Sequence, residues 1–217
     1  MSNVNLMQEI SLFPIPNVVA FPGTVIPLHV FEPRYRTMVT DCLNSSRIIG
    51  VCHTKKEISP APRNQTVEET LSANQATYKP FDIFSAGECE IIEETSDGRI
   101  LANIYIANRY IARSEVQTLP YRIVSAELLE DEPLDENLEA LCASVHKIFL
   151  ALIKKQNPSL AAEINESNWP KLSPSAYSFK LFQFIRLEPN LMQSLLASTS
   201  AKSRLERIHE VLKGNAP

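Results

Sequence analysis

The residues best suited to recognition chemistry lie together in one short stretch, at Glu32, Arg34, Tyr35 and Arg36. Arginine and tyrosine are favoured at recognition surfaces because each offers a wide contact area together with directional hydrogen bonds. The same residues can instead be structural, with Glu32 paired to an arginine and Tyr35 packed on a core. The stretch therefore predicts either a binding surface or a packed ion pair, and we favour the second interpretation.

A second basic and aromatic group, Arg109, Tyr110 and Arg113, has the spacing of residues along one strand. Together with Arg34 and Arg36 it could form a continuous basic surface that binds RNA phosphates with salt-sensitive affinity. It could equally be the ordinary exposed face of a strand. The formal net charge of −4 counts against a broad nucleic-acid surface, so RNA is the less favoured partner.

Motifs of known catalytic sites are missing from this sequence. No glycine is followed by lysine, so the phosphate-binding loop of ATPases is absent, and there is no G-x-S-x-G elbow. His209-Glu210 begins like the H-E-x-x-H zinc motif, but Lys213 stands where the second histidine is needed. The four histidines lie far apart, and the acidic pairs fit solvated turns better than a pocket. We therefore predict a chain that is not an enzyme and carries no cofactor or metal.

Composition places the chain among soluble globular proteins. It has 217 residues, of which 44% are hydrophobic and 21% charged, enough apolar sequence for a sizeable core. No apolar run approaches the roughly 20 residues that span a bilayer, so no membrane is expected. The N-terminus has no basic region followed by an apolar block, which argues against a secretory signal. The four cysteines have no C-x-x-C spacing and are expected to be reduced and buried in a cytoplasmic protein, although spacing leaves a zinc site from histidines and cysteines open as the less favoured alternative.

The recognition residues lie at the end of an apolar, proline-rich segment, Leu12–Met38. Proline lacks a backbone donor and biases the residue before it towards extended geometry, so a helix is not expected before Pro33. Pro22-Gly23 is typical of a sharp turn. After Pro33 the apolar spacing becomes helical, with proline well placed as the first helical residue. The segment contains five of the fifteen prolines, Pro14, Pro16, Pro22, Pro27 and Pro33.

A long polar segment, Thr54–Lys79, follows the next expected strand, Arg47–His53. It contains two prolines and few large apolar residues. Connections of this length are uncommon in compact domains unless they are functional or mobile. We favour a disordered or loosely packed insertion; the alternative is a loop that closes over a binding surface.

Several short strands are expected between Phe81 and Leu129. Asp97-Gly98 within Ser96–Arg99 predicts a hairpin with a type I′ turn, since this dipeptide tolerates positive φ. Short strands separated by turn signals, with few helices between them, indicate a small barrel or a sandwich.

The apolar pattern becomes helical from Asp135 to the end of the chain. We therefore predict an α+β protein with a β subdomain over residues 8–133 and a helical subdomain over residues 134–217. The expected helix signals are Asp135 as the first N-cap, Asn157-Pro158 as a stop, Ser173-Pro174 and Pro189 as further starts, and Thr199 or Ser200 as the last cap.

The order of these residues resembles the N-terminal, substrate-binding domain of Lon proteases. The resemblance is carried by Leu12-Phe13-Pro14-Ile15, Val18-Val19-Ala20-Phe21-Pro22-Gly23 and Ile26-Pro27-Leu28-His29-Val30-Phe31, and in the helical part by Leu195-Leu196 and Arg204-Leu205-Glu206-Arg207-Ile208. The continuation Phe31–Arg36 looks like single-domain bacterial members that lack the protease. The resemblance covers about Ile10 to Lys213 and is weakest over 54–79 and 165–171.

The resemblance implies a PUA-like β pseudo-barrel followed by a helical bundle, and a module that binds unfolded polypeptide segments or a protein partner without catalysis. A PUA-like barrel also keeps RNA binding open as the alternative function. An apolar groove is expected to mark the peptide site, because exposed apolar patches commonly do so. The candidate peptide- or partner-binding residues are Phe21, Val25, Phe31, Glu32, Arg34 and Tyr35.

Overall fold

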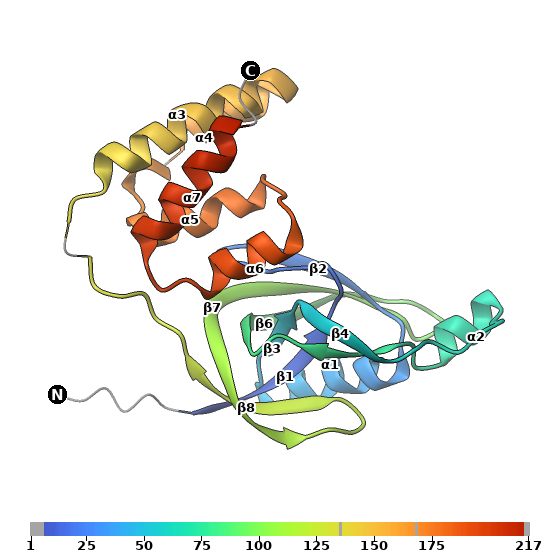
Figure 1. The fold of residues 1–217 in the computed structure, drawn as a ribbon. Helices are drawn as coiled ribbons and strands as arrows, with labels where there is room; N and C mark the ends of the chain where they lie inside the picture. Colours follow the sequence, from blue (N-terminus) through green and yellow to red (C-terminus); the bar gives the residue numbers. More distant parts are fainter. Residues whose placement is uncertain (1–6, 135, 168, 215–217) are drawn as a thin grey trace. The chain divides into compact units, whose positions relative to one another are not determined.

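The computed structural model describes residues 7–134, 136–167 and 169–214, and these form two compact units. The β unit contains the described residues up to Leu129 together with Leu187–Ala197, and the helical unit contains the remaining described residues from Glu130 onward. The predicted α+β class is confirmed (Figure 1). This division assigns Leu187–Ala197 to the β unit, whereas the sequence-based boundary between residues 133 and 134 groups it with the other helices; that boundary stays a prediction.

A six-stranded sheet with strand order β2-β7-β6-β3-β1-β8 forms the framework of the β unit. A further pairing of β7 with β8 closes five of these strands into a barrel, and β2 pairs with β7 alone. Strands β1 and β3 run parallel, while the other pairs are antiparallel. The strands are β1 (Gln8–Pro14), β2 (Val25–Val30), β3 (Ile49–Cys52), β6 (Ile83–Glu94), β7 (Ile100–Gln117) and β8 (Arg122–Leu128).

Strand β7 closes the barrel because it is long enough to pair with β6 along one edge and with β8 along the other. Its first part, Ile100–Tyr105, pairs with β2, and its last part, from Tyr110 to Gln117, pairs with β8. Register shifts along both its β6 and β8 pairings mark bulges, which bend a strand and increase its twist.

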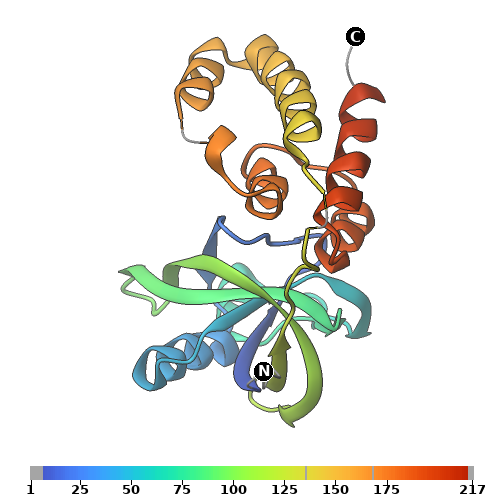
Figure 2. The same ribbon diagram turned by 90° about the vertical axis from the view of Figure 1, so that its left-hand side faces the viewer.

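Helix α1 (Pro33–Ser45) lies beside the barrel and contributes to its core (Figure 2). It begins at Pro33, which confirms the predicted start, and its residues Tyr35, Met38, Val39 and Cys42 are buried. These side chains belong to one apolar cluster with residues of β2 and β7, so the helix shields the apolar side chains of these strands from water.

The hairpin between β6 and β7 forms where it was expected, but the predicted type I′ turn is wrong. Thr95 N donates to Arg99 O at 2.9 Å and Gly98 N donates to Thr95 O at 2.8 Å, which defines a three-residue loop. Gly98 has φ +79°, and Asp97 does not share this positive φ. A type I′ turn needs two such residues, whereas a type I turn followed by one left-handed glycine needs one.

Residues 54–79 form secondary structure, so the expectation of a disordered insertion is wrong, while most side chains of its first strand are exposed. Strands β4 (Thr54–Ser59) and β5 (Thr77–Pro80) pair as an antiparallel ribbon, and helix α2 (Val67–Ser72) follows the ribbon's first strand (Figure 1). Thr66 and Glu69 form a reciprocal capping box at the start of α2. In the ribbon, backbone N–H and C=O groups of the two strands bond to each other, which orders a segment with few apolar side chains to bury.

Helix α6 (Pro189–Ala197) packs within the β unit, against β6. Gln193 Nε2 donates to Ile83 O at 2.9 Å, and Arg109 of β7 donates to Leu196 O at 2.5 Å. The side chains of Met192, Leu195 and Leu196 are buried. These contacts explain why this helix belongs with the strands although the sequence places it among helices.

The helical unit is built from α3 (Glu139–Gln156), α4 (Pro158–Glu166), α5 (Pro174–Lys180) and α7 (Ala201–Gly214), with short 3-10 turns η1 (Trp169–Lys171) and η2 (Leu181–Gln183). Ser173 caps α5, which confirms the predicted start. Asn157, predicted only as the end of a helix, also caps α4, a helix that was not predicted. Asn137 Oδ1 accepts from Glu139 N at the start of α3. The predicted cap Asp135 lies outside the described residues.

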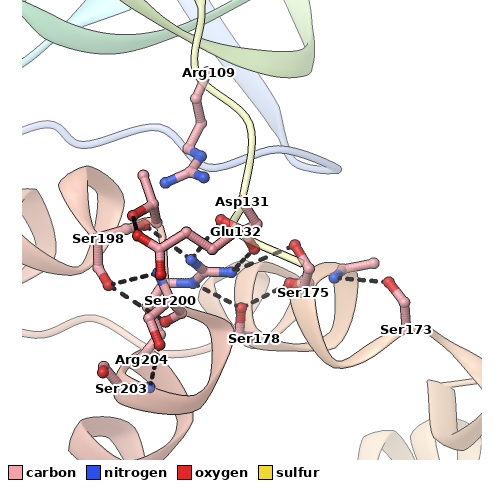
Figure 3. A network of polar contacts seen from close by, with 12 residues as sticks. Arg109, Asp131, Glu132, Ser173, Ser175, Ser178, Ser198, Ser200, Ser203 and Arg204 are labelled. Carbon is pink, nitrogen blue, oxygen red and sulfur yellow. Dashed lines mark hydrogen bonds and ion pairs between the residues drawn. The ribbon is translucent and has the colours of Figure 1, made fainter. Parts of the chain in front are cut away.

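An ion pair is buried in the helical unit between Arg204 of α7 and Asp131 (Figure 3). The Arg204 side chain has no exposed surface, and Asp131 is 14% exposed. Arg204 also donates to Ser178 Oγ at 3.0 Å and Ser198 O at 2.9 Å, and its guanidinium lies 4.1 Å from the ring centre of Phe179. Through these contacts the Arg204 guanidinium connects α7 with α5 and with the segment before α3.

Candidate functional site

A groove of about 420 Å³ opens in the β unit at the proline-rich stretch. Apolar and aromatic side chains form most of its wall, with a few polar groups at one edge. The lining residues come from the end of β1, from β2, from the start of α1 and from the 54–79 insertion: Phe13, Pro14, Ile15, Pro16, Pro27, Leu28, His29, Phe31, Glu32, Arg34, Tyr35, Ala61, Gln75, Ala76 and Tyr78.

Tyr35 forms a rigid part of the groove wall. Its ring stacks on Phe13 with centroids 4.3 Å apart, and the Arg34 guanidinium lies 4.7 Å from its centroid on the face of the ring. The residue is 8% exposed, and burial raises the pKa of Tyr35 to about 12. Tyr35 is therefore a neutral phenol at physiological pH and presents an apolar surface.

Glu32 and Arg34 connect this wall to the insertion. Arg34 Nη2 lies 2.7 Å from Glu32 Oε2, so the predicted structural pairing of Glu32 with an arginine is confirmed. Glu32 Oε2 accepts from Gln75 N at 2.9 Å, while Arg34 donates to Thr77 Oγ1 at 3.0 Å and Ala76 O at 2.8 Å. This mostly buried pair holds the end of the insertion in place as the polar edge of the groove.

We expect Arg34→Ala to release the segment around Gln75 and Thr77 while the barrel stays folded. The substitution removes the hydrogen bonds from Arg34 to Thr77 Oγ1 and Ala76 O, and it leaves Glu32 without its counter-charge. The free energy of local opening should fall by about 2 kcal/mol, read as faster amide hydrogen exchange over residues 74–78.

Arg36→Ala is the matched control, because Arg36 belongs to the same helix but donates to Gly98 O at 3.0 Å, away from the insertion. Unchanged exchange over 74–78 in Arg34→Ala would contradict the anchoring role of the ion pair.

Four of the six candidate residues line the groove: Phe31, Glu32, Arg34 and Tyr35. Phe21 does not, since it is 1% exposed and lies in the core. Its segment is held on the barrel wall because Ser85 Oγ donates to Ala20 O at 2.7 Å and Gly23 N donates to Ile106 O at 2.8 Å. Val25 is 46% exposed on β2 but is not part of the groove lining.

Sequence reasoning missed the groove residues at the end of β1 and in the insertion. The run Phe13–Pro16 carried a usable signal, because alternating proline and apolar residues form extended backbone that offers few donors to a sheet. Gln75, Ala76 and Tyr78 carried none, since only folding brings them next to Glu32 and Arg34, more than 40 residues earlier in the chain.

The four arginines considered for RNA binding do not form a continuous basic surface. Arg109 is 3% exposed and donates to Leu196 O, and Arg34 is paired with Glu32. Arg113 Nε donates to Glu127 Oε2 at 2.7 Å. Arg36 of α1 is a partly exposed cation that donates to Gly98 O in the hairpin loop.

Two further structural findings bear on the nature of the site. Among the described residues, no group of three or more histidine, cysteine, aspartate or glutamate side chains is arranged to hold a metal ion. Within the same residues, every helix is too short or too polar to cross a membrane.

The sequence matches the family described as ATP-dependent protease La (LON) substrate-binding domain over residues 9–214. Lon protease 1 of Herpetosiphon aurantiacus is 25% identical over 214 residues, covering 94% of this chain and 24% of that protein. Lon protease of Flavobacterium johnsoniae is 23% identical over 211 residues, with the same coverage. The chain thus spans about a quarter of the length of these curated relatives.

Two solved structures share this fold. The N-terminal domain of the Mycobacterium avium complex Lon protease matches with a TM-score of 0.66 and 13% identity, covering 95% of this chain and 98% of that one. The Lon N-terminal domain protein from Xanthomonas campestris matches with a TM-score of 0.61 and 18% identity, covering 93% and 96% of the two chains. At these identities the likeness establishes the fold alone.

Proposed function

The chain belongs to the ATP-dependent protease La (LON) substrate-binding domain family, and we propose that it binds unfolded polypeptide segments without catalysing a reaction itself. The groove beside Tyr35 carries this proposal. A dedicated protein partner that presents an extended apolar segment would use the same surface.

The chemistry of the groove supports an extended apolar segment as its ligand. Phe31 and Tyr78 are partly exposed, and the wall behind them is made of proline, leucine and stacked aromatic rings. Peptide sites of this kind combine apolar pockets for side chains with a few polar groups for the backbone. Gln75, Glu32, Arg34 and His29 are the polar residues of the lining.

We also place this activity in the cytoplasm as part of the proposal. The four cysteines are free thiols, which suits a reducing compartment.

The proposal predicts that Phe31→Ala and Tyr78→Ala each weaken binding of an unfolded polypeptide by about tenfold. Partly exposed aromatic residues in an apolar site typically contribute 1–2 kcal/mol or more, which corresponds to this factor. Binding can be measured by fluorescence anisotropy with a labelled, reduced and carboxymethylated protein that cannot refold. Most of the affinity should persist at high salt because apolar contacts are not screened.

Val25→Ala is the matched control, since it truncates an exposed apolar residue of the same β unit outside the groove. Equal losses in Val25→Ala and Phe31→Ala would exclude the groove as the binding site. Salt-sensitive binding to a structured RNA, without binding to the unfolded chain, would favour RNA recognition as the function instead. Binding to neither probe would favour a dedicated protein partner.

A further inference from the structure

The helical unit contains a cavity of its own, with a volume of about 620 Å³. This lies within the range of sites that enclose small molecules, roughly 300–1,000 Å³. Helices α3 and α5 and the turn η1 surround it. The lining residues are Glu139, Cys142, Ala143, His146, Lys147, Leu150, Trp169, Lys171, Leu172, Pro174 and Tyr177.

Stacked aromatic rings hold the wall of this cavity in shape. The ring of Trp169 lies parallel to that of Phe149 with centroids 5.7 Å apart, and it meets Tyr177 edge-on at 6.4 Å. Phe149 and Tyr177 are 1% and 2% exposed, so the surrounding core restrains them. Leu150, Leu172 and Pro174 extend this apolar surface, which fits a hydrocarbon or aromatic body.

One polar group in the wall lacks a partner. His146 Nδ1 lies 3.2 Å from the Tyr177 hydroxyl, while His146 Nε2 is buried and has no hydrogen-bond partner among the described residues. Burial raises the pKa of Tyr177 and lowers the pKa of His146, so both groups are neutral. The neutral His146 therefore adds no charge to the cavity wall.

The charges around the cavity are mainly positive. Lys147 and Lys171 line it and are exposed, and neither has an ion-pair partner within the described part of the chain. The Lys180 ammonium lies 5.9 Å from the ring centroid of Trp169. Glu139 is the single carboxylate in the lining.

We propose that this cavity binds a small amphipathic carboxylate, with its apolar body against Trp169 and its carboxylate towards Lys147 and Lys171. The aromatic wall and the excess of lysine in the lining support this class of ligand together. The carboxylate can belong to a free aliphatic acid or to the C-terminus of a short apolar peptide. This site lies within the helical unit and shares no lining residue with the groove of the proposed function.

Trp169 makes the test direct, because it is the single tryptophan of the chain and forms part of the cavity wall. We expect titration with octanoate to change the tryptophan fluorescence of the full chain saturably. Octanol and octylamine share the same hydrocarbon body and should bind at least tenfold more weakly. Each lysine that contacts the carboxylate should raise the affinity about fivefold; octanol loses both ion pairs, and the ammonium of octylamine is repelled by both lysines. A short peptide ending in leucine, compared with its C-terminal amide, separates the two sources of the carboxylate.

Two variants localise the effect. Ala143→Phe fills the cavity from an exposed position and should abolish the octanoate response. The double variant Lys147→Gln with Lys171→Gln should weaken octanoate by more than tenfold and leave octanol unchanged, while Lys155→Gln, on the same helix outside the cavity, should change neither. A wild-type octanoate response in Ala143→Phe, or equal affinity for octanoate and octanol in the native chain, would overturn the proposal.

Discussion

Asp131→Ala is expected to lower the free energy of unfolding of the helical unit by about 3–5 kcal/mol, because it leaves a buried guanidinium without its counter-charge. The Arg204 side chain is fully buried, so water cannot replace the lost carboxylate without opening the structure. The remaining partners are Ser175, Ser178 and Ser198, whose neutral oxygen atoms cannot neutralise a full charge (Figure 3). Denaturant unfolding followed by Trp169 fluorescence reports this unit specifically, since the tryptophan lies within it.

Two comparisons separate this effect from the general loss of an ion pair. Glu136→Ala breaks the exposed pair between Glu136 and Lys202, whose side chains are 52% and 45% exposed, and should have a much smaller effect. Asp131→Ala combined with Arg204→Met removes both charges, and we expect it to be more stable than Asp131→Ala alone. A loss in Asp131→Ala no larger than that in Glu136→Ala would show that the buried pair does not govern the stability of the helical unit.

Gly87→Ala is expected to destabilise the β unit by about 3 kcal/mol or more, which is large for the addition of one methyl group. A Cβ atom at this position would lie 1.7 Å from the backbone oxygen of Tyr105 on the neighbouring strand. The obstacle is backbone rather than a movable side chain, so β6 and β7 would have to separate at a bulge that contributes to barrel closure. Thermal unfolding followed by circular dichroism would measure the loss.

Gly214→Ala provides the control, because Gly214 ends helix α7 and, apart from its chain neighbours and its own helix backbone, no atom of the described residues lies within 4 Å of the position of its Cβ. We expect a change within about 0.5 kcal/mol there. If Gly87→Ala behaved like Gly214→Ala, the strands would have room to accommodate the methyl group, and the close approach at the bulge would not restrict residue choice.

Local signals in the sequence predicted the elements whose causes are local. Pro33 starts α1, Ser173 caps α5, and Gly98 supplies the positive φ of the hairpin loop. In each case one residue type satisfies a backbone requirement that its neighbours create. The turn type at Asp97-Gly98 was predicted wrongly because two-residue and three-residue loops use the same dipeptide, and strand register chooses between them.

The candidate site was only partly predictable, because its two halves are distant in the sequence. The stretch from Phe31 to Tyr35 was recognised by its residue types, and four of the six candidates line the groove. Phe21 was misplaced because an apolar residue beside a turn can face either the core or the solvent, and periodicity does not distinguish the two in a short run.

The order of residues in this chain was sufficient to identify its family, its α+β class and several starts of its helices, since these depend on neighbours in the sequence. Folding in three dimensions was needed to place the 54–79 insertion on Glu32 and Arg34, to pack α6 against β6, and to surround a cavity with Trp169, His146 and Tyr177. These features arise from contacts between residues far apart in the chain. A polar segment or an amphipathic helix has many compatible partners, and the packing of the whole unit selects one of them.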